Sequence, residues 1–78
     1  MRKIKMIWDF RGPNALKIAE HHAIHLNEYA KINHVTKSGV GTETISDMHV
    51  IAYMVVNEDQ TPTLREALKP HRGQVYND

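Results

Sequence analysis

With 78 residues the chain has room for one small domain. Its ten basic and nine acidic residues leave a formal charge of +1, so it lacks the basic excess of a dedicated nucleic-acid-binding protein. It has no cysteine, which excludes disulfides and thiolate zinc sites, so metal ligands would have to come from His, Asp or Glu. No segment approaches the roughly 18 apolar residues of a membrane span, and the basic residues 1–5 are not followed by the apolar run of a signal peptide. We therefore expect one domain over residues 1–78 of a cytoplasmic protein that binds neither nucleic acid nor a membrane.

The first part of the chain predicts a strand followed by a long helix. Apolar and polar residues alternate over 4–10, which is typical of a strand with one strongly buried face, and Trp8 lies on that face. Gly12 and Pro13 end the strand, and a helix follows over about residues 14–33, with Asn14 or Gly12 as its N-cap. Its apolar stripe consists of Ala15, Ile18, Ala19, His22, Ala23, Leu26, Tyr29 and Ala30.

Three histidines fall within five residues in the middle of this predicted helix. At about 100° per residue, His22 lies inside the apolar stripe, whereas His21 and His25 lie together on its polar flank beside Glu28. We therefore expect His22 to face the sheet near Trp8, and the other two imidazoles to face water.

The middle of the chain predicts two further strands. Residues 35–41 contain glycines that predict a turn region, and residues 41–45 predict a short strand that ends in a turn at 46–47. Residues 49–57 give the strongest strand signal and are apolar at odd and even positions alike. Such a strand should be covered on both faces.

The last part of the chain predicts a short helix and an edge strand. After a polar loop at 57–60, Thr61 is a plausible N-cap for a helix over residues 62–69, with Pro62 at its first position. Its inward residues should be Leu64, Ala67 and Leu68. Pro70 ends the helix, and residues 71–76 could form the edge strand.

The predicted order is β-α-β-β-α-β, which is the split arrangement of the ferredoxin-like fold. We therefore predict an α+β domain in which both helices lie on one face of a four-stranded antiparallel sheet. The second apolar face of residues 49–57 must then meet another surface. In so short a chain a second copy is the simplest partner, so we expect a homodimer with its sheets face to face.

The topology, the histidines on the first helix and the segment LREALKPH at 64–71 resemble the small stand-alone proteins of the dimeric α+β-barrel superfamily. The resemblance covers nearly the whole chain as architecture and is strongest to short members, some of which are linked to nickel or other metals. It implies a homodimer and leaves the cofactor open, with a divalent metal, Ni or Zn, as the candidate. Monooxygenases of that superfamily place Asn, Trp and His in a pocket between helix and sheet. Trp8 and His22 match the Trp and the His, and no residue here matches the Asn.

The first candidate site is a metal site at His21 and His25. Side chains four residues apart on a helix point the same way and can reach one ion, and Glu28 could add a carboxylate. The alternative is a solvated helix flank without a ligand.

The second candidate site is a pocket around His22. A buried neutral imidazole needs a partner for each ring nitrogen, and Trp8 and Tyr53 could supply the donors. His22 is then either a satisfied core residue or a pocket residue that transfers a proton or contacts a ligand.

Further polar candidates lie elsewhere. By alternation, Asp9 and His49 share with Tyr53 the sheet face opposite the helices, where they form either an interfacial polar network or a catalytic group. His71 belongs to a basic turn at 69–73 that could hold a small anion or be an ordinary loop.

Three classes of function follow. The favoured one is a small homodimeric binding protein with a His-containing site for a metal ion or a small ligand. The alternatives are a small-molecule enzyme of the α+β-barrel type, which would use Trp8 and His22, and a regulatory interaction module without chemistry. The sequence does not decide whether the protein is an enzyme.

Overall fold

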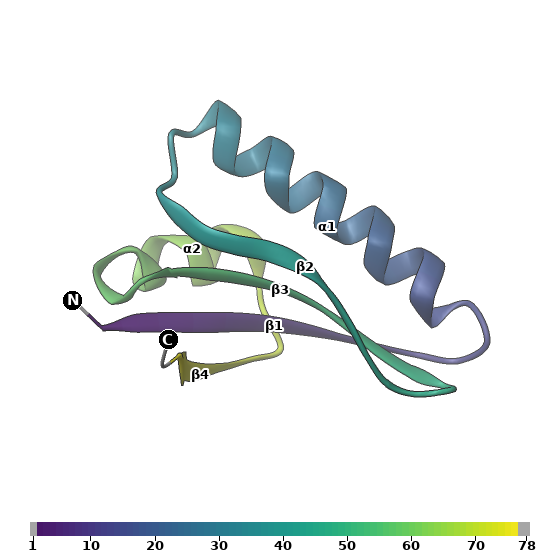
Figure 1. Cartoon of the computed structure of the whole chain (residues 1–78). Coiled ribbons are helices and arrows are strands. Elements are labelled where there is room, and N and C mark those ends of the chain that lie inside the picture. Colours follow the sequence, from purple (N-terminus) through teal and green to yellow (C-terminus); the bar gives the residue numbers. More distant parts are fainter. Residues whose placement is uncertain (1, 77–78) are drawn as a thin grey trace.

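The computed structural model describes residues 2–76 and contains a four-stranded antiparallel sheet with two helices on one of its faces (Figure 1). The elements in chain order are β1 (Lys3–Arg11), α1 (Ala15–Ile32), β2 (Lys37–Ser46), β3 (His49–Asn57), a 3₁₀ turn (Glu58–Gln60), α2 (Thr61–Leu68) and β4 (Arg72–Tyr76). The strand order is β2-β3-β1-β4. The predicted ferredoxin-like α+β fold is therefore confirmed. No helix within residues 2–76 is long and apolar enough to cross a membrane.

The two central strands, β1 and β3, decide which side chains face the helices. They pair in antiparallel register along their whole length. Because side chains alternate along a strand, Met6 and Trp8 face the helices, whereas Ile7 and Asp9 face the other side of the sheet. We call that side the open face. Tyr53 lies opposite Ile7 in the register and therefore also belongs to the open face.

The helix α1 packs on the sheet through a side made almost entirely of alanine. Its buried residues are Ala15, Ala19, Ala23, Leu26 and Ala30. They meet a buried layer of strand residues: Met6, Trp8, Val50, Ala52, Met54 and Val56. Small side chains bring the helix axis close to the strands, so the thin domain still excludes water from this layer. Ile18, which the sequence places in the same stripe, is 49% exposed, because it lies on the flank of the stripe.

The open face is also apolar at its centre. Three of its side chains are only 2–3% exposed: Ile7, Ile51 and Val55. No helix within residues 2–76 covers them. Long polar side chains lie across them instead: the ammonium of Lys5 is 3.3 Å from a carboxylate oxygen of Glu43 and 4.6 Å from the centre of the Tyr53 ring. The prediction that residues 49–57 are buried on both faces is confirmed for these positions.

The strand β2 is longer than predicted. The prediction of a turn over 35–41 is wrong for residues 37–41, which pair with β3. Gly41 lies opposite Tyr53, and the Tyr53 ring occupies the space above it, because a Cβ added at Gly41 would lie 2.9 Å from the Tyr53 hydroxyl oxygen. Cover by an aromatic ring compensates for the poor packing of glycine in a strand.

The helix α2 differs from its prediction at its start and on its inner side. It begins at Thr61 with Gln60 as the N-cap residue, and the Thr61 hydroxyl donates to the carbonyl oxygen of Glu58 at 2.7 Å. Leu64 is buried and Leu68 half-buried, as expected, but Ala67 is exposed. A helix of eight residues with one fully buried side chain covers little of the sheet.

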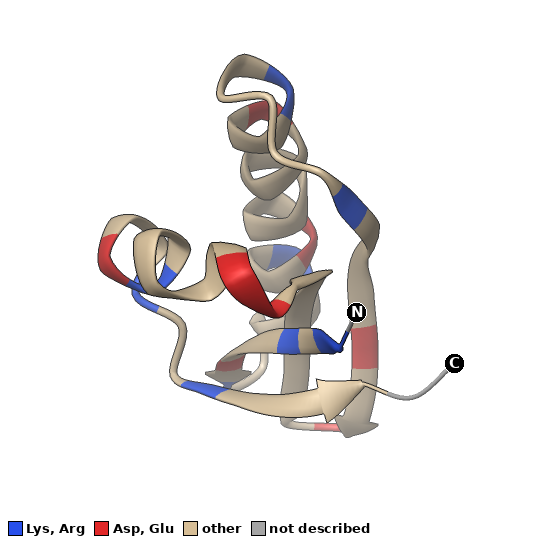
Figure 2. Cartoon of the chain, turned by 90° about the vertical axis from the view of Figure 1, so that its left-hand side faces the viewer, with Lys and Arg blue, Asp and Glu red and all other residues tan. Residues whose placement is uncertain are grey.

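Basic and acidic positions are interspersed over the helices and strands (Figure 2). In Figure 2 both helices carry positions of both signs, whereas the 3₁₀ turn carries the adjacent acidic residues Glu58 and Asp59. The formal charge of +1 is the balance of these positions.

Candidate functional site

His22 lies between α1 and the end of β1, packed against two aromatic rings. Its ring centre is 5.0 Å from that of Trp8 and 5.4 Å from that of Phe10. The alanine-rich side of α1 determines this position, because it draws the helix onto the strand that carries both aromatic residues. The prediction that His22 faces the sheet near Trp8 is thus met by the geometry.

The inner nitrogen of His22 has no hydrogen-bond partner. Its Nε2 atom is buried, and no donor or acceptor within residues 2–76 bonds to it. Burial lowers the pKa of His22 below its ordinary value of 6.5, and His25 and His71 lower it further. The imidazole is therefore neutral at pH 7. An unpaired buried polar atom costs about 1–3 kcal/mol, so this position is unfavourable for the stability of the isolated chain.

Neither donor predicted for His22 reaches it. The indole N–H of Trp8 donates to the carbonyl oxygen of Leu68 at 2.9 Å and ties the end of α2 to β1. Tyr53 lies on the open face, since Ala52 is the residue opposite Trp8 in the register. The structure therefore brings together Trp8 and His22 but not Tyr53, and a pocket of all three is wrong.

The outer side of His22 opens onto a shallow hollow of about 380 Å³. The hollow is lined by Lys17, Ile18, His21, His22 and His25. Three imidazoles and one ammonium group therefore converge on one surface of α1. Sequence reasoning missed Lys17, although it lies four residues before His21 and helical spacing could have found it.

His21 and His25 lie side by side on this surface, with ring centres 5.0 Å apart. Glu28 is 3.2 Å from Nδ1 of His25, so its carboxylate is engaged with one member of the pair. Within residues 2–76, no group of three or more His, Asp and Glu side chains is placed so that it could hold a metal ion. The predicted pair is present and exposed, and it offers two imidazole ligands.

On the open face, Asp9 is the centre of a charged network. Its carboxylate accepts hydrogen bonds from Nε of Arg72 at 3.0 Å and Nη2 of Arg72 at 3.1 Å, and it lies 2.7 Å from Nε2 of His49. The bonds from Arg72, and secondarily the one from His49, hold the pKa of Asp9 well below its usual range against the opposing effect of burial. Asp9 and His49 are therefore in contact, as expected for two residues on the same face of the sheet. Sequence reasoning missed Arg72, because its place depends on the register of β4.

His71 connects this network to the surroundings of His22. Its Nδ1 accepts a hydrogen bond from the backbone N–H of Asp9 at 2.8 Å, and its ring centre is 6.4 Å from that of Phe10. The connection from α2 to β4 is thus fixed to β1 by three hydrogen bonds, since the Trp8 indole donates to Leu68 and the backbone N–H of His71 donates to the carbonyl oxygen of Ile7 at 2.9 Å. His71 therefore holds this connection against β1 and packs near Phe10, which in turn contacts His22.

Comparison of the chain with protein-family models, with curated proteins and with solved structures finds no match. The geometry around His22 is therefore the basis for assigning a function.

Proposed function

We propose that the chain is a small homodimeric binding protein that recognises a small ligand at the hollow beside His22. The observation that supports this most is the unpaired, buried Nε2 of a histidine whose outer side opens onto that hollow. Groups that serve recognition are often kept at a cost in stability. Only a ligand group or a ligand-ordered water that reaches Nε2 itself would remove this cost, since a bond to the outer side of the ring leaves Nε2 unpaired.

The lining of the hollow favours a compact polar ligand. A neutral imidazole presents one N–H donor and one acceptor, and Lys17 adds a positive charge at the rim. Trp8 and Phe10 hold the His22 ring from behind, so its orientation is set before a ligand arrives. Preorganisation of this kind lowers the entropic cost of binding.

The homodimer is the second part of the proposal, with the open face as the surface of contact. Its centre is apolar, and two further apolar side chains lie exposed on it, Ile45 at 50% and Tyr76 at 37%. Four charged groups on this face are already paired within one copy, Asp9 with Arg72 and Lys5 with Glu43. Paired charges cost less to bury than isolated ones, which supports a second copy as the occupant.

Native mass spectrometry of the untagged protein tests the ligand part of the proposal. The wild-type protein should carry an additional mass that the His22→Leu variant lacks. An Ile24→Leu variant is the matched control, because Ile24 is 56% exposed on the same helix and does not line the hollow. An additional mass that is retained equally by His22→Leu would contradict the assignment of the site.

A metal ion is the second candidate ligand, supported by the 5.0 Å separation of the His21 and His25 rings. Calorimetry with Ni²⁺ or Zn²⁺ should then show binding that weakens as the pH falls through the imidazole range, because protons compete for the ligand nitrogens. Replacing both residues with Gln should abolish it and leave the fold intact. A dissociation constant no lower than tens of micromolar, which corresponds to a binding free energy of about 6 kcal/mol, would exclude a specific metal site.

A further inference from the structure

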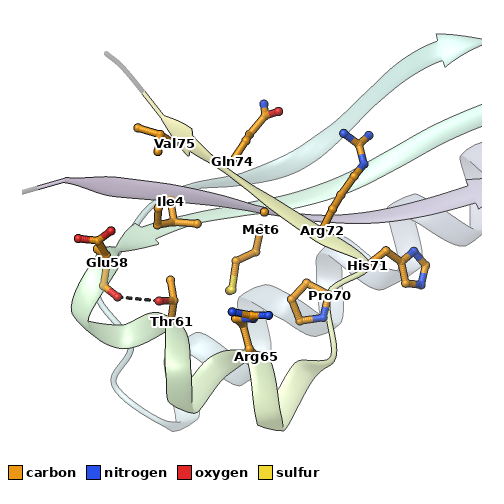
Figure 3. Close-up of a pocket in the computed structure, with 11 residues that line it drawn as sticks. Ile4, Met6, Glu58, Thr61, Arg65, Pro70, His71, Arg72, Gln74 and Val75 are labelled. Carbon is orange, nitrogen blue, oxygen red and sulfur yellow. Dashed lines mark hydrogen bonds between the residues drawn. The ribbon is translucent and has the colours of Figure 1, made fainter.

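A second pocket, separate from His22, lies between α2 and the edge of the sheet formed by β1 and β4 (Figure 3). Its volume is about 400 Å³, which falls within the range of small-molecule sites, roughly 300–1,000 Å³. The connection between α2 and β4 separates it from the His22 hollow, and the bond from the Trp8 indole to Leu68 holds that connection in place.

The floor of this pocket is apolar and incompletely covered. In the register of β1 and β4, Ile4 lies opposite Val75 and Met6 lies opposite Gly73. Gly73 has no side chain to fill its position, and a Cβ placed there would only just touch Ile4, at 3.5 Å. Val75 is 47% exposed. Apolar surface is therefore left open to a ligand beneath α2.

A positively charged side chain, Arg65 of α2, lies over the apolar floor of this pocket. Figure 3 shows Arg65 rising from α2 toward Met6, whereas Arg72 points to the other side of the sheet. The Arg65 guanidinium has no hydrogen-bond or ion-pair partner within residues 2–76. The acidic residue of the lining, Glu58, is already neutralised by Arg2, with 2.8 Å between Nη2 and Oε2. The pocket thus offers one unpaired cation beside an apolar floor.

We propose that this pocket binds a small amphipathic carboxylate, with its hydrocarbon part against Ile4 and Val75 and its carboxylate against Arg65. A guanidinium matches a carboxylate in geometry and charge, and the open apolar floor accepts a short alkyl chain. Pairing with the ligand would satisfy Arg65 and cover Val75 at the same time.

Titration of ¹⁵N-labelled protein with sodium octanoate, followed by NMR, tests this site. Saturable shifts should be confined to the amides around the pocket, including Ile4, Arg65, Gly73 and Val75. Arg65→Gln should weaken octanoate binding at least ten-fold. Gly73→Val, which suits a strand and fills the pocket, should abolish it. Octan-1-ol, which lacks the charge, should bind more weakly and be insensitive to Arg65→Gln.

Two control variants distinguish a specific role of Arg65 from a general effect of charge and from binding at the His22 hollow. Lys31→Gln removes the same charge from the last turn of α1 and should leave octanoate binding unchanged. His22→Leu should also leave it unchanged, so failure here is distinguishable from failure at the His22 hollow. Absence of saturable shifts at Ile4 and Val75, shifts centred on the open face, or equal affinity for Arg65→Gln and the wild-type protein would each overturn the proposal.

Discussion

Asp9 holds the short edge strand β4 to the rest of the sheet. Its side chain bonds to Arg72 of β4 and His49 of β3, and its backbone N–H donates to His71 just before β4. All five residues of β4 are exposed, so burial contributes little to its attachment. The carboxylate and its partners therefore have a large share in fixing this strand, which also forms one side of the pocket beneath α2.

We predict that Asp9→Asn destabilises the protein at pH 7 and that its deficit shrinks in acid. The folded chain keeps Asp9 ionised to a pH well below 3.8, the ordinary pKa of the group, so its stabilisation is present above that pH and is lost as the pH falls toward the folded-state pKa. Urea unfolding of both proteins from pH 7 to pH 2.5 measures the difference. Asp59→Asn, at an exposed position outside the network, is the matched control. A deficit that stays constant over this range would contradict the assignment.

One glycine and one aromatic ring make a close contact across the pair of strands β2 and β3. Gly41 leaves room for the Tyr53 ring, and the same ring lies beneath the ammonium of Lys5, which reaches on to Glu43 of β2. A layer of side chains thus bridges β1, β3 and β2 across the open face. It shields Ile51 and Val55 in a single copy.

Gly41→Ala should therefore lower the free energy of unfolding by about 1–2 kcal/mol, the usual cost of overpacking. The new Cβ would stand 2.9 Å from the Tyr53 hydroxyl oxygen and 3.2 Å from its Cζ, so the ring must move. Gly39→Ala is the matched control in the same strand, since a Cβ there meets no atom within 4 Å. A double-mutant cycle with Tyr53→Ala should remove the cost. If both glycine substitutions lowered the free energy of unfolding equally, the packing of the Tyr53 ring over Gly41 would not be the cause.

The elements with strong periodicity could be predicted from the sequence, and those fixed by pairing could not. The alanine spacing of α1 and the apolar run of β3 are local patterns, and both elements lie close to their predicted bounds. The start of β2 could not be predicted, because Gly39 and Gly41 favour a turn locally and become strand only through β3. At the site, His22 and Trp8 follow from their own elements, whereas Phe10, His71 and Arg72 acquire their roles through contacts between elements. Tyr53 does not join His22, because the register places it on the open face, which the alternation of residues 49–57 also indicates.

The molecule as a unit has a helix-covered face, which contains the main core, and an open face with a second, thinner apolar layer. A chain of this length buries only about 60% of the surface that it exposes when unfolded. Association through the open face would add burial where the single copy has least of it. This is the physical reason for proposing a homodimer.

Tyr53→Glu should dissociate that dimer. The substitution places a carboxylate at the centre of the open face, where the second copy would have to desolvate it, and the protein should sediment as a monomer. Tyr53→Phe keeps the ring above Gly41 and should remain a dimer. A wild-type protein that sediments as a monomer at high micromolar concentration would contradict the homodimer.

The role of His22 has a signature in the pH dependence of folding. Its pKa is lowered in the folded chain, so the unfolded chain takes up a proton near pH 6.5 that the folded chain resists. The free energy of unfolding should therefore fall as the pH drops below about 6.5. The contribution of His22 to this decrease should be absent in the His22→Leu variant.

The central claim is that His22 is held for recognition and not for stability, and urea unfolding of His22→Leu at pH 7 tests it most directly. Leucine fills a similar volume between Trp8 and Phe10 and removes the unpaired Nε2. We expect a variant at least as stable as the wild-type protein in the absence of ligand. A loss of more than about 1 kcal/mol would mean that both nitrogens of the imidazole are satisfied in the folded chain, and would contradict the claim.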